Sequence, residues 1–503
     1  MFKGQPKGLI AAALANMGER FGFYTMMAIL VLFLQAKYGL NGKDAGLIYS
    51  IFYFSIYILA FVGGLIADRI RNYKGTIFAG LIVMAAGYVL MAIPTPTPVP
   101  NKTLFLTITL AGLFIIAFGN GLFKGNLQAL VGQMYDNEKY GKLRDSGFSI
   151  FYMFINVGAI FAPFAAVGIR NWWLKSHGLG YNADLPDLCH QQLEGTLSGD
   201  ALARYQELIP QVGGSASDLT GFANEYLSVF STGFHYAFGA AIVAMLISVV
   251  IYLGNKGKFP SVQKKAKDAT VTKEEVKMDA KEVKQRIYAL LAVFSVVIFF
   301  WFSFHQNGLT LTLFAKEYTE LSIFGMDITA EVFQSMNPFF VVFLTPIIVA
   351  VFGWLRAKGK EPSTPRKIAI GMFIAALGYV LMLVGSLNVP LHEDVVAMGG
   401  LEQAQRVTPF LLIGTYFILT VAELFISPLG ISFVSKVAPP HLQGVMQGGW
   451  LGATAVGNQL LFIGAILYES IPIWMTWGVF VVACVISMFT MIFMLKWLER
   501  VAK

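Results

Sequence analysis

A glutamate and an arginine, Glu19 and Arg20, stand side by side in the middle of an apolar run that is long enough to cross a bilayer. A charged side chain at the bilayer centre costs about 2.5–3.5 kcal/mol on insertion scales, so such residues usually mark a substrate or ion pathway. In a helix Asn16, Arg20 and Tyr24 repeat every four residues and therefore share one face, which Glu19 and Phe23 flank. We expect this face to look into a cavity between helices.

Two more charges, Lys124 and Glu423, fall inside apolar runs, and the four intramembrane charges sum to zero. Four isolated charges would together cost on the order of 10 kcal/mol at the same rate, so we expect them to pair or to line a wet cavity. A purely structural ion-pair network is the alternative. Lys124 lies near the end of its run and could instead extend to the membrane interface.

Further polar residues occupy apolar runs at positions that suit a binding site. His305 is an imidazole, the side chain that changes charge near neutral pH, although it could also be a hydrogen-bonded packing residue. Asn156 could bind a substrate or form a hydrogen bond between helices. Asn337 precedes Pro338, which we expect to kink its helix. Ser427 follows one helical turn after the glutamate of the tenth run.

The elements that must position these residues are membrane helices. The chain has 503 residues, of which 56% are hydrophobic and only 13% are charged, and this excludes an ordinary soluble globular protein. Apolar runs of eighteen or more residues recur along it, each long enough to span the hydrocarbon core. We therefore predict an all-α membrane protein. The twelve predicted spans are 8–35, 44–67, 75–93, 104–130, 146–169, 228–253, 287–314, 330–355, 367–388, 409–435, 444–467 and 471–496.

The net charge of +8 follows the predicted topology rather than a nucleic-acid surface. When both termini are placed inside, the inside segments carry 27 lysines and arginines and the outside loops carry 8. This is the positive-inside bias of membrane proteins. The two cysteines, Cys189 and Cys484, provide neither a disulfide framework nor metal-ligand spacing. We expect a multi-pass protein with cytoplasmic termini, without a metal and without a nucleic-acid partner.

The twelve runs divide into two sets of six. We predict an N-terminal six-helix bundle over 1–253, a Lys-rich cytoplasmic linker over 254–286 and a C-terminal six-helix bundle over 287–503. A long outside loop at 170–225 has an acidic excess and no assigned role. Two parallel six-span halves are the architecture of the major facilitator superfamily.

The loop after the second run resembles the loop signature of that superfamily, because a glycine pair is followed by Asp68 and Arg69. These two residues can pair with a neighbouring helix, and we expect them to act in gating together with Lys124 and Glu423. Over nearly its whole length the chain resembles the proton-dependent oligopeptide transporter (POT) family. The matching residues are Glu19, Arg20, Phe21 and Tyr24 of the first run, Tyr53 of the second, Lys124 and Asn126 of the fourth, Tyr152, Asn156 and Gly158 of the fifth, Asn337 and Pro338 of the eighth, Glu423 of the tenth and Trp450 of the eleventh.

The resemblance implies uptake of di- and tripeptides with protons, by alternating access around a central cavity. A short peptide at neutral pH is a zwitterion, so its pocket needs a positive and a negative pole. Arg20 and Lys124 would bind the peptide carboxylate, Arg20 by two parallel hydrogen bonds, and Glu423 would bind the ammonium group. The other expected substrate-binding residues are Asn156 and Asn337 for the peptide backbone, Tyr24, Tyr53 and Trp450 for its side chains, and Ser427.

Two departures from the family pattern concern proton coupling. Asn16 replaces the first glutamate of the first-helix motif, which removes a carboxylate that could titrate. His305 stands where many bacterial members carry an acid, and Met27 where they carry its arginine partner, so the outer-gate ion pair of the family is absent. Glu19 is the expected proton carrier, because its protonation would release Arg20 to the peptide. His305 is a second candidate.

We therefore predict a secondary transporter of the cell (inner) membrane that works as a monomer and draws its energy from the proton gradient, without a cofactor. Its expected partners are di- or tripeptides, protons and the lipid bilayer. We do not expect an enzyme, since the sequence has no Gly-x-Ser-x-Gly motif and no complete zinc motif. Two alternatives stay open: a family member with a different substrate or with altered or lost coupling, and a peptide-binding sensor that transports nothing.

Overall fold

The computed structural model describes residues 4–70, 72–135, 137–140, 143–260, 280–439 and 442–502. These residues are almost entirely helical, and one short hairpin, β1–β2, joins two of the later helices. The elements in chain order are α1 (Leu9–Tyr38), α2 (Gly42–Ile70), α3 (Tyr73–Ala92), α4 (Lys102–Met134), α5 (Arg144–Ser176), α6 (Leu185–Glu194), α7 (Gly199–Gln211), α8 (Leu219–Gly254), η2 (Lys256–Lys258), α10 (Ala280–Phe304), η4 (His305–Gly308), α11 (Thr310–Tyr318), β1 (Ser322–Ile323), β2 (Met326–Asp327), η5 (Ala330–Ser335), α12 (Met336–Ala357), α13 (Thr364–Gly385), α14 (His392–Met398), η6 (Gln403–Gln405), α15 (Pro409–Val437), α16 (Gln443–Gln459), α17 (Leu461–Ser470) and α18 (Ile473–Val501).

Twelve spans in the described residues are long and apolar enough to cross a membrane, which confirms the number predicted from the sequence. Nine of them are single helices. The seventh is built from α10, η4 and α11, the eighth from η5 and α12, and the eleventh from α16 and α17. A 20-residue helix already covers about 30 Å, the thickness of the hydrocarbon core, so each span has the length that its role needs.

Two of the composite spans change helix type beside polar residues. The seventh span turns into a 3-10 helix at His305, and it passes so close to α2 that a Cβ on Gly308 would overlap the hydroxyl of Tyr49. The eighth span changes from a 3-10 helix to an α-helix at Met336. Pro338 therefore lies in the first turn of α12, where its missing N–H leaves no hydrogen bond of that helix unmade, and the kink expected at this residue stays a prediction.

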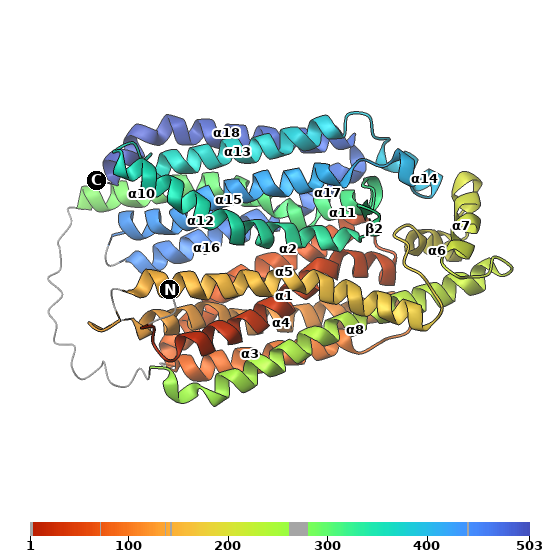
Figure 1. Ribbon diagram of the computed structural model, residues 1–503, viewed down its shortest axis with the longest axis horizontal. Coiled ribbons are helices and arrows are strands. Elements are labelled where there is room, and N and C mark those ends of the chain that lie inside the picture. Colours follow the sequence, from red (N-terminus) through yellow and green to blue (C-terminus); the bar gives the residue numbers. More distant parts are fainter. Residues whose placement is uncertain are drawn as a thin grey trace.

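Figure 1 shows the helices running roughly parallel, with the two ends of the chain at one end of the bundle. We call this the termini end. At the opposite end, the loop end, lie α6, α7, α14 and the hairpin. Residues 4–260 are called the N-half here and residues 280–502 the C-half. Within the N-half α1 packs on α5 and α8, and α3 packs on α4; within the C-half α13 packs on α15 and α18.

The two halves meet along two pairs of helices. In one, α2 of the N-half packs on α16 and α17 of the C-half, and in the other α5 packs on η5 and α12. The cavity described below lies between these contacts. The predicted linker at 254–286 is described only up to residue 260 and from residue 280, so most of it lies outside the described residues.

The loop between the fifth and sixth spans is shorter and more ordered than the predicted segment 170–225. Helix α5 continues to Ser176 and α8 already begins at Leu219, because apolar and aromatic residues extend both helices beyond the predicted ends. Two amphipathic helices, α6 and α7, fill the remaining segment. They bury Leu188, Cys189 and Tyr205 among other residues.

Close contact between α2 and α4 depends on glycine. A Cβ on Gly63 would overlap the carbonyl oxygen of Gly121, and a Cβ on Gly121 would overlap the carbonyl oxygen of Leu59. In a membrane, helices associate through packing and not through the exclusion of water, so small residues at such a contact contribute directly to stability.

We predict that Gly63→Ala lowers the thermal stability of the detergent-solubilised protein by several degrees, since overpacking costs about 1–3 kcal/mol. Gly64→Ala is the matched control, because no atom lies within 4 Å of its Cβ position and the gain in helix propensity is the same. Melting curves of the two variants check the prediction. Equal melting temperatures would contradict the prediction, because they would show that α2 and α4 can accommodate the added methyl group without loss of stability.

Candidate functional site

Side chains from both halves line a cavity of about 240 Å³ at the middle of the bundle. Seven of the nine predicted substrate-binding residues are among them, and the wall includes side chains from several spans of each half. The lining residues are Asn16, Arg20, Phe23, Tyr24, Met27, Tyr49, Tyr53, Tyr57, Lys124, Gln128, Tyr152, Ile155, Ala159, Pro163, Trp301, Phe304, His305, Asn307, Gly308, Gln334, Asn337, Pro338, Glu423 and Ser427.

Arg20 and Glu19 form a buried ion pair on α1. Nε and Nη2 of Arg20 donate to the two carboxylate oxygens of Glu19 at 2.5 and 2.6 Å. Asn120 of α4 donates a third hydrogen bond to Glu19, also at 2.5 Å. The guanidinium faces the cavity and rests 4.6 Å from the ring centre of Phe23, whereas Glu19 lies behind it. The predicted pairing of intramembrane charges therefore occurs between these two residues.

Lys124 reaches the cavity from α4 and has an aromatic neighbour instead of an acid. Its ammonium nitrogen lies 4.3 Å from the ring centre of Tyr57, a cation–π contact with α2. Within the described chain no carboxylate forms an ion pair with it. Lys124 lines the cavity, so its side chain does not extend to the membrane interface.

Glu423 enters the cavity from α15, in the C-half. Its carboxylate accepts a hydrogen bond of 2.8 Å from the amide of Asn337 on α12, which also donates to Thr420 at 3.0 Å. This amide fixes the position of the carboxylate without neutralising its charge. No basic side chain forms an ion pair with Glu423 among the residues that the structure covers.

His305 lies where the seventh span breaks, and it is held by neutral neighbours. Its Nδ1 donates to the side-chain oxygen of Asn458 at 2.5 Å. The ring stacks on Trp301 and makes a tilted contact with Tyr53, each 4.7 Å away between ring centres. The contacts described for His305 include no carboxylate, so its arrangement is that of a packed and hydrogen-bonded residue at the cavity wall.

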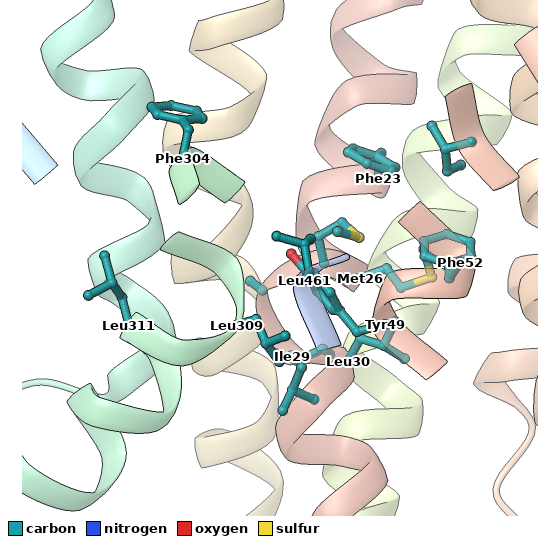
Figure 2. Close-up of a cluster of buried hydrophobic side chains, with 14 of the residues drawn as sticks. Phe23, Met26, Ile29, Leu30, Tyr49, Phe52, Phe304, Leu309, Leu311 and Leu461 are labelled. Carbon is teal, nitrogen blue, oxygen red and sulfur yellow. The ribbon is translucent and has the colours of Figure 1, made fainter. Parts of the chain in front are cut away.

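Apolar side chains close the cavity toward the loop end. Figure 2 shows this cluster, in which Ile29 and Leu30 of α1 meet Tyr49 of α2, Leu309 and Leu461. All five are at most 2% exposed. We call these residues the apolar plug. From Thr25 to Tyr38 every residue of α1 is buried, so the helix is enclosed on all sides at this end.

Toward the termini end the packing is looser. Several residues of α1 between Leu14 and Tyr24 are partly exposed, and Gln128, one turn beyond Lys124 on α4, is exposed although it lines the cavity. Tyr152 of α5 is 43% exposed in the same region. The cavity is therefore closed at the loop end and accessible from the termini end.

Besides Glu19, three predicted site residues lie away from the cavity wall. The amide of Asn156 donates to the backbone oxygen of Tyr152, four residues earlier on the same helix. Trp450 is buried against Gly430 and the ring of Phe294. Arg69 is exposed near the end of α2. The side chain of a fourth, Asp68, lies outside the described residues.

Sequence reasoning missed two tyrosines of the cavity wall, Tyr49 and Tyr57, and it named a third, Tyr152, only as a match to the family pattern. Tyr49, Tyr53 and Tyr57 are spaced by four residues, and their rings contact one another in sequence along α2 at 5.8 Å. This spacing was visible in the second apolar run, and it could have identified Tyr49 and Tyr57 as neighbours of Tyr53 on the same helix face. Gln128 was also visible, one helical turn after Lys124.

Comparisons with known proteins show which proteins this chain resembles. The curated relatives include the peptide transporter YePEPT of Yersinia enterocolitica, which is 29% identical over 91% of this chain and 87% of its own length. Dipeptide and tripeptide permease B of Xenorhabdus bovienii is 27% identical over 99% of this chain and 97% of its own length. A solved structure titled as the peptide transporter POT in complex with sulfate has a TM-score of 0.73 at 23% identity, and covers 100% of this chain and 96% of that one.

The structural likeness establishes the fold as that of the major facilitator superfamily, with twelve transmembrane helices in two six-helix bundles. The sequence model described as the POT family matches residues 74–274 and 258–475, which together span most of the chain. The chain belongs to the POT family.

Proposed function

We propose that this protein imports di- and tripeptides together with protons, as a monomeric secondary transporter of the cell (inner) membrane. The names of the curated relatives, a peptide transporter and a dipeptide and tripeptide permease, support the substrate class. In this proposal residues 1–253 and 287–503 are the two bundles, the segment 254–286 joins them in the cytoplasm, and they move against each other around the cavity.

The main support for this proposal is that two side chains of opposite charge line one cavity and that neither has an ion-pair partner in the part of the chain that the structure describes. Lys124 of α4 and Glu423 of α15 both line it, and neither has an oppositely charged partner among the described residues. A zwitterionic peptide supplies both missing partners, its carboxylate to Lys124 and its ammonium group to Glu423. Because the two residues belong to different halves, a bound peptide would also link the halves.

The surrounding side chains suit a peptide of varied sequence. Asn337 donates to Glu423, and its amide oxygen stays available to the peptide backbone. Tyr24 and Tyr53 supply aromatic surface, and Ser427 adds a hydroxyl one turn beyond the glutamate. We keep Asn156 and Trp450 as proposed substrate contacts only for a state in which the helices have moved, since neither lines the cavity here.

Glu19 is our proposed proton carrier. Its carboxylate accepts three short hydrogen bonds, two from Arg20 and one from Asn120. Protonation would remove the charge that holds Arg20 and free the guanidinium for the peptide carboxylate. His305, whose ring contacts those of Trp301 and Tyr53, is a proposed second carrier.

The distribution of basic residues supports cytoplasmic termini, with 27 lysines and arginines on that side against 8 on the other. In this orientation the cavity opens to the cytoplasm and the structure is an inward-facing state. Arg69 lies exposed at the cytoplasmic end of α2, where we propose that it and Asp68 pair when that end closes. Lys124 and Glu423 would take part in gating through the peptide that they share.

A second candidate, a transporter with altered or lost coupling, rests on Asn16. This residue lines the cavity beside Arg20 and cannot take up a proton where the family motif has a glutamate. The test of the proposed function separates the two candidates.

Uptake of a labelled dipeptide into proteoliposomes, with and without an imposed inward proton gradient, tests the proposal. We expect accumulation above equilibrium only with the gradient. Equilibration at the same rate in both conditions would identify the uncoupled transporter. Absence of entry, with the protein shown to be folded, would reject peptide transport.

Glu19→Gln should abolish gradient-driven accumulation and leave counterflow intact. The amide cannot carry a proton, but it preserves the size of the side chain and still accepts a hydrogen bond from Arg20. Counterflow, which needs only exchange of peptide across the membrane, is the internal control. Accumulation that survives the substitution would assign the proton to another residue.

Glu423→Gln should raise the KM for peptides with a free amine about tenfold, which corresponds to about 1.4 kcal/mol. The reason is the loss of a charge-assisted hydrogen bond to the ammonium group. Amine-blocked peptides are the control, since they carry no charge at this position and should be affected much less. Equal losses for both kinds of peptide would contradict the assigned role.

A further inference from the structure

Two ion pairs join the short helix α6 of the N-half to the C-half at the loop end. Asp184, the residue before α6, accepts a hydrogen bond of 2.8 Å from Nη2 of Arg406. Asp187, in the first turn of α6, lies 2.5 Å from the ammonium nitrogen of Lys316. The side chains of Asp184, Arg406 and Lys316 are all at least nine-tenths buried. These contacts connect residues 222 and 129 positions apart in the sequence.

A turn of the C-half packs closely against α6. The turn after α14 contains Gly399 and Gly400, both with positive φ angles, of 75° and 105°. A Cβ on Gly400 would lie 2.5 Å from the carboxyl carbon of Asp184, and one on Gly399 would lie 3.1 Å from a methyl group of Leu188. The backbone of this turn therefore approaches α6 more closely than any larger residue would allow.

The opposite side of α6 is attached to α1. Nε2 of His190 lies 2.8 Å from the backbone oxygen of Ala36, at hydrogen-bond distance. The imidazole ring covers Gly39, where a Cβ would be 3.0 Å from Nδ1. Helix α6 lies at the loop end (Figure 1), where it therefore contacts both α1 and the C-half.

We propose that α6 is a strap that holds the loop end of the transport pathway closed, and that its two ion pairs set how often this end opens. The inference rests on the proposed transport cycle, in which the loop end must open to admit the peptide. It gives a role to the loop between the fifth and sixth spans, and it identifies Asp184 and Asp187 as positioning residues that never touch the substrate.

The physical argument concerns the difference between the closed and the open state. In the closed state Asp184, Arg406 and Lys316 are at least nine-tenths buried, so each of them depends on its partner. In the open state the partners separate into water and are hydrated instead. Neutralising the acids therefore leaves Arg406 and Lys316 buried without their ion-pair partners only in the closed state, which shifts the equilibrium toward opening.

Spin labels at Lys102→Cys and Leu387→Cys would report the separation of the halves at the loop end. Both positions are exposed, the first at the start of α4 and the second just after α13. The native cysteines are buried, and burial raises the pKa of the Cys189 thiol to about 12, so it stays protonated and unreactive at neutral pH. The distance distribution is measured by pulsed electron spin resonance, without substrate.

We expect Asp184→Asn with Asp187→Asn to raise the ratio of long to short distances about tenfold. Glu207→Gln is the matched control, since Glu207 pairs with Arg204 on the same helix α7 and bridges no gap between the halves. It should leave the distribution unchanged. A charge exchange, Asp187→Lys with Lys316→Asp, should bring the distribution closer to the parent than either single change does.

An unchanged distribution in the folded double variant would overturn the proposal, as would an equal shift in Glu207→Gln. If the double variant does not fold, Asp187→Asn alone is measured, because that side chain is 43% exposed and its loss perturbs the fold least. The distances need no peptide. They therefore test the strap even if the proteoliposomes show no peptide uptake.

Discussion

The charges placed inside the membrane are the constraint on which the other features depend, since each of them must find a partner or water. Glu19 and Arg20 satisfy each other within one turn of α1, with Asn120 adding a hydrogen bond from α4. Lys124 and Glu423 do not meet in this way. The cavity wall that carries Lys124 and Glu423 must therefore stay in contact with water when no substrate is bound. A cavity that is accessible from one end meets this requirement.

Helix α1 shows how one element serves both ends of the cavity. Its first part carries the ion pair and faces the cavity, and its second part, from Thr25 onward, is buried on every side. The change occurs near Met27, where polar residues give way to Ala, Ile, Leu, Val and Phe. In this structure the polar side of the helix faces the cavity, and its apolar part is packed against other helices.

The sequence predicted what depends on local composition. Apolar length determined the twelve spans, and the cost of burying charge identified Glu19, Arg20, Lys124 and Glu423 as a group. The sequence could not predict the direction of a side chain that can form a hydrogen bond within its own helix.

Asn156 is an example of that limit, because it bonds to the carbonyl four residues earlier and does not line the cavity. The ion pairs of the strap could not be predicted from the sequence either. They join residues more than a hundred positions apart, and nothing in the local pattern of an acidic loop indicates which distant cation each acid will meet.

The closed loop end combines two kinds of contact that respond differently to water. Separation of the apolar plug raises the free energy in proportion to the apolar area that is exposed to water, by about 25 cal/mol per Å². Ion pairs at the rim exchange one set of favourable interactions for another when they are hydrated. At the positions where the family pattern has its outer-gate pair, this chain has Met27, which lines the cavity, and His305, which stacks on Trp301. In the proposed cycle, charge that closes the rim from outside the cavity would not compete for the peptide, and this would leave Lys124 and Glu423 free to bind the substrate alone.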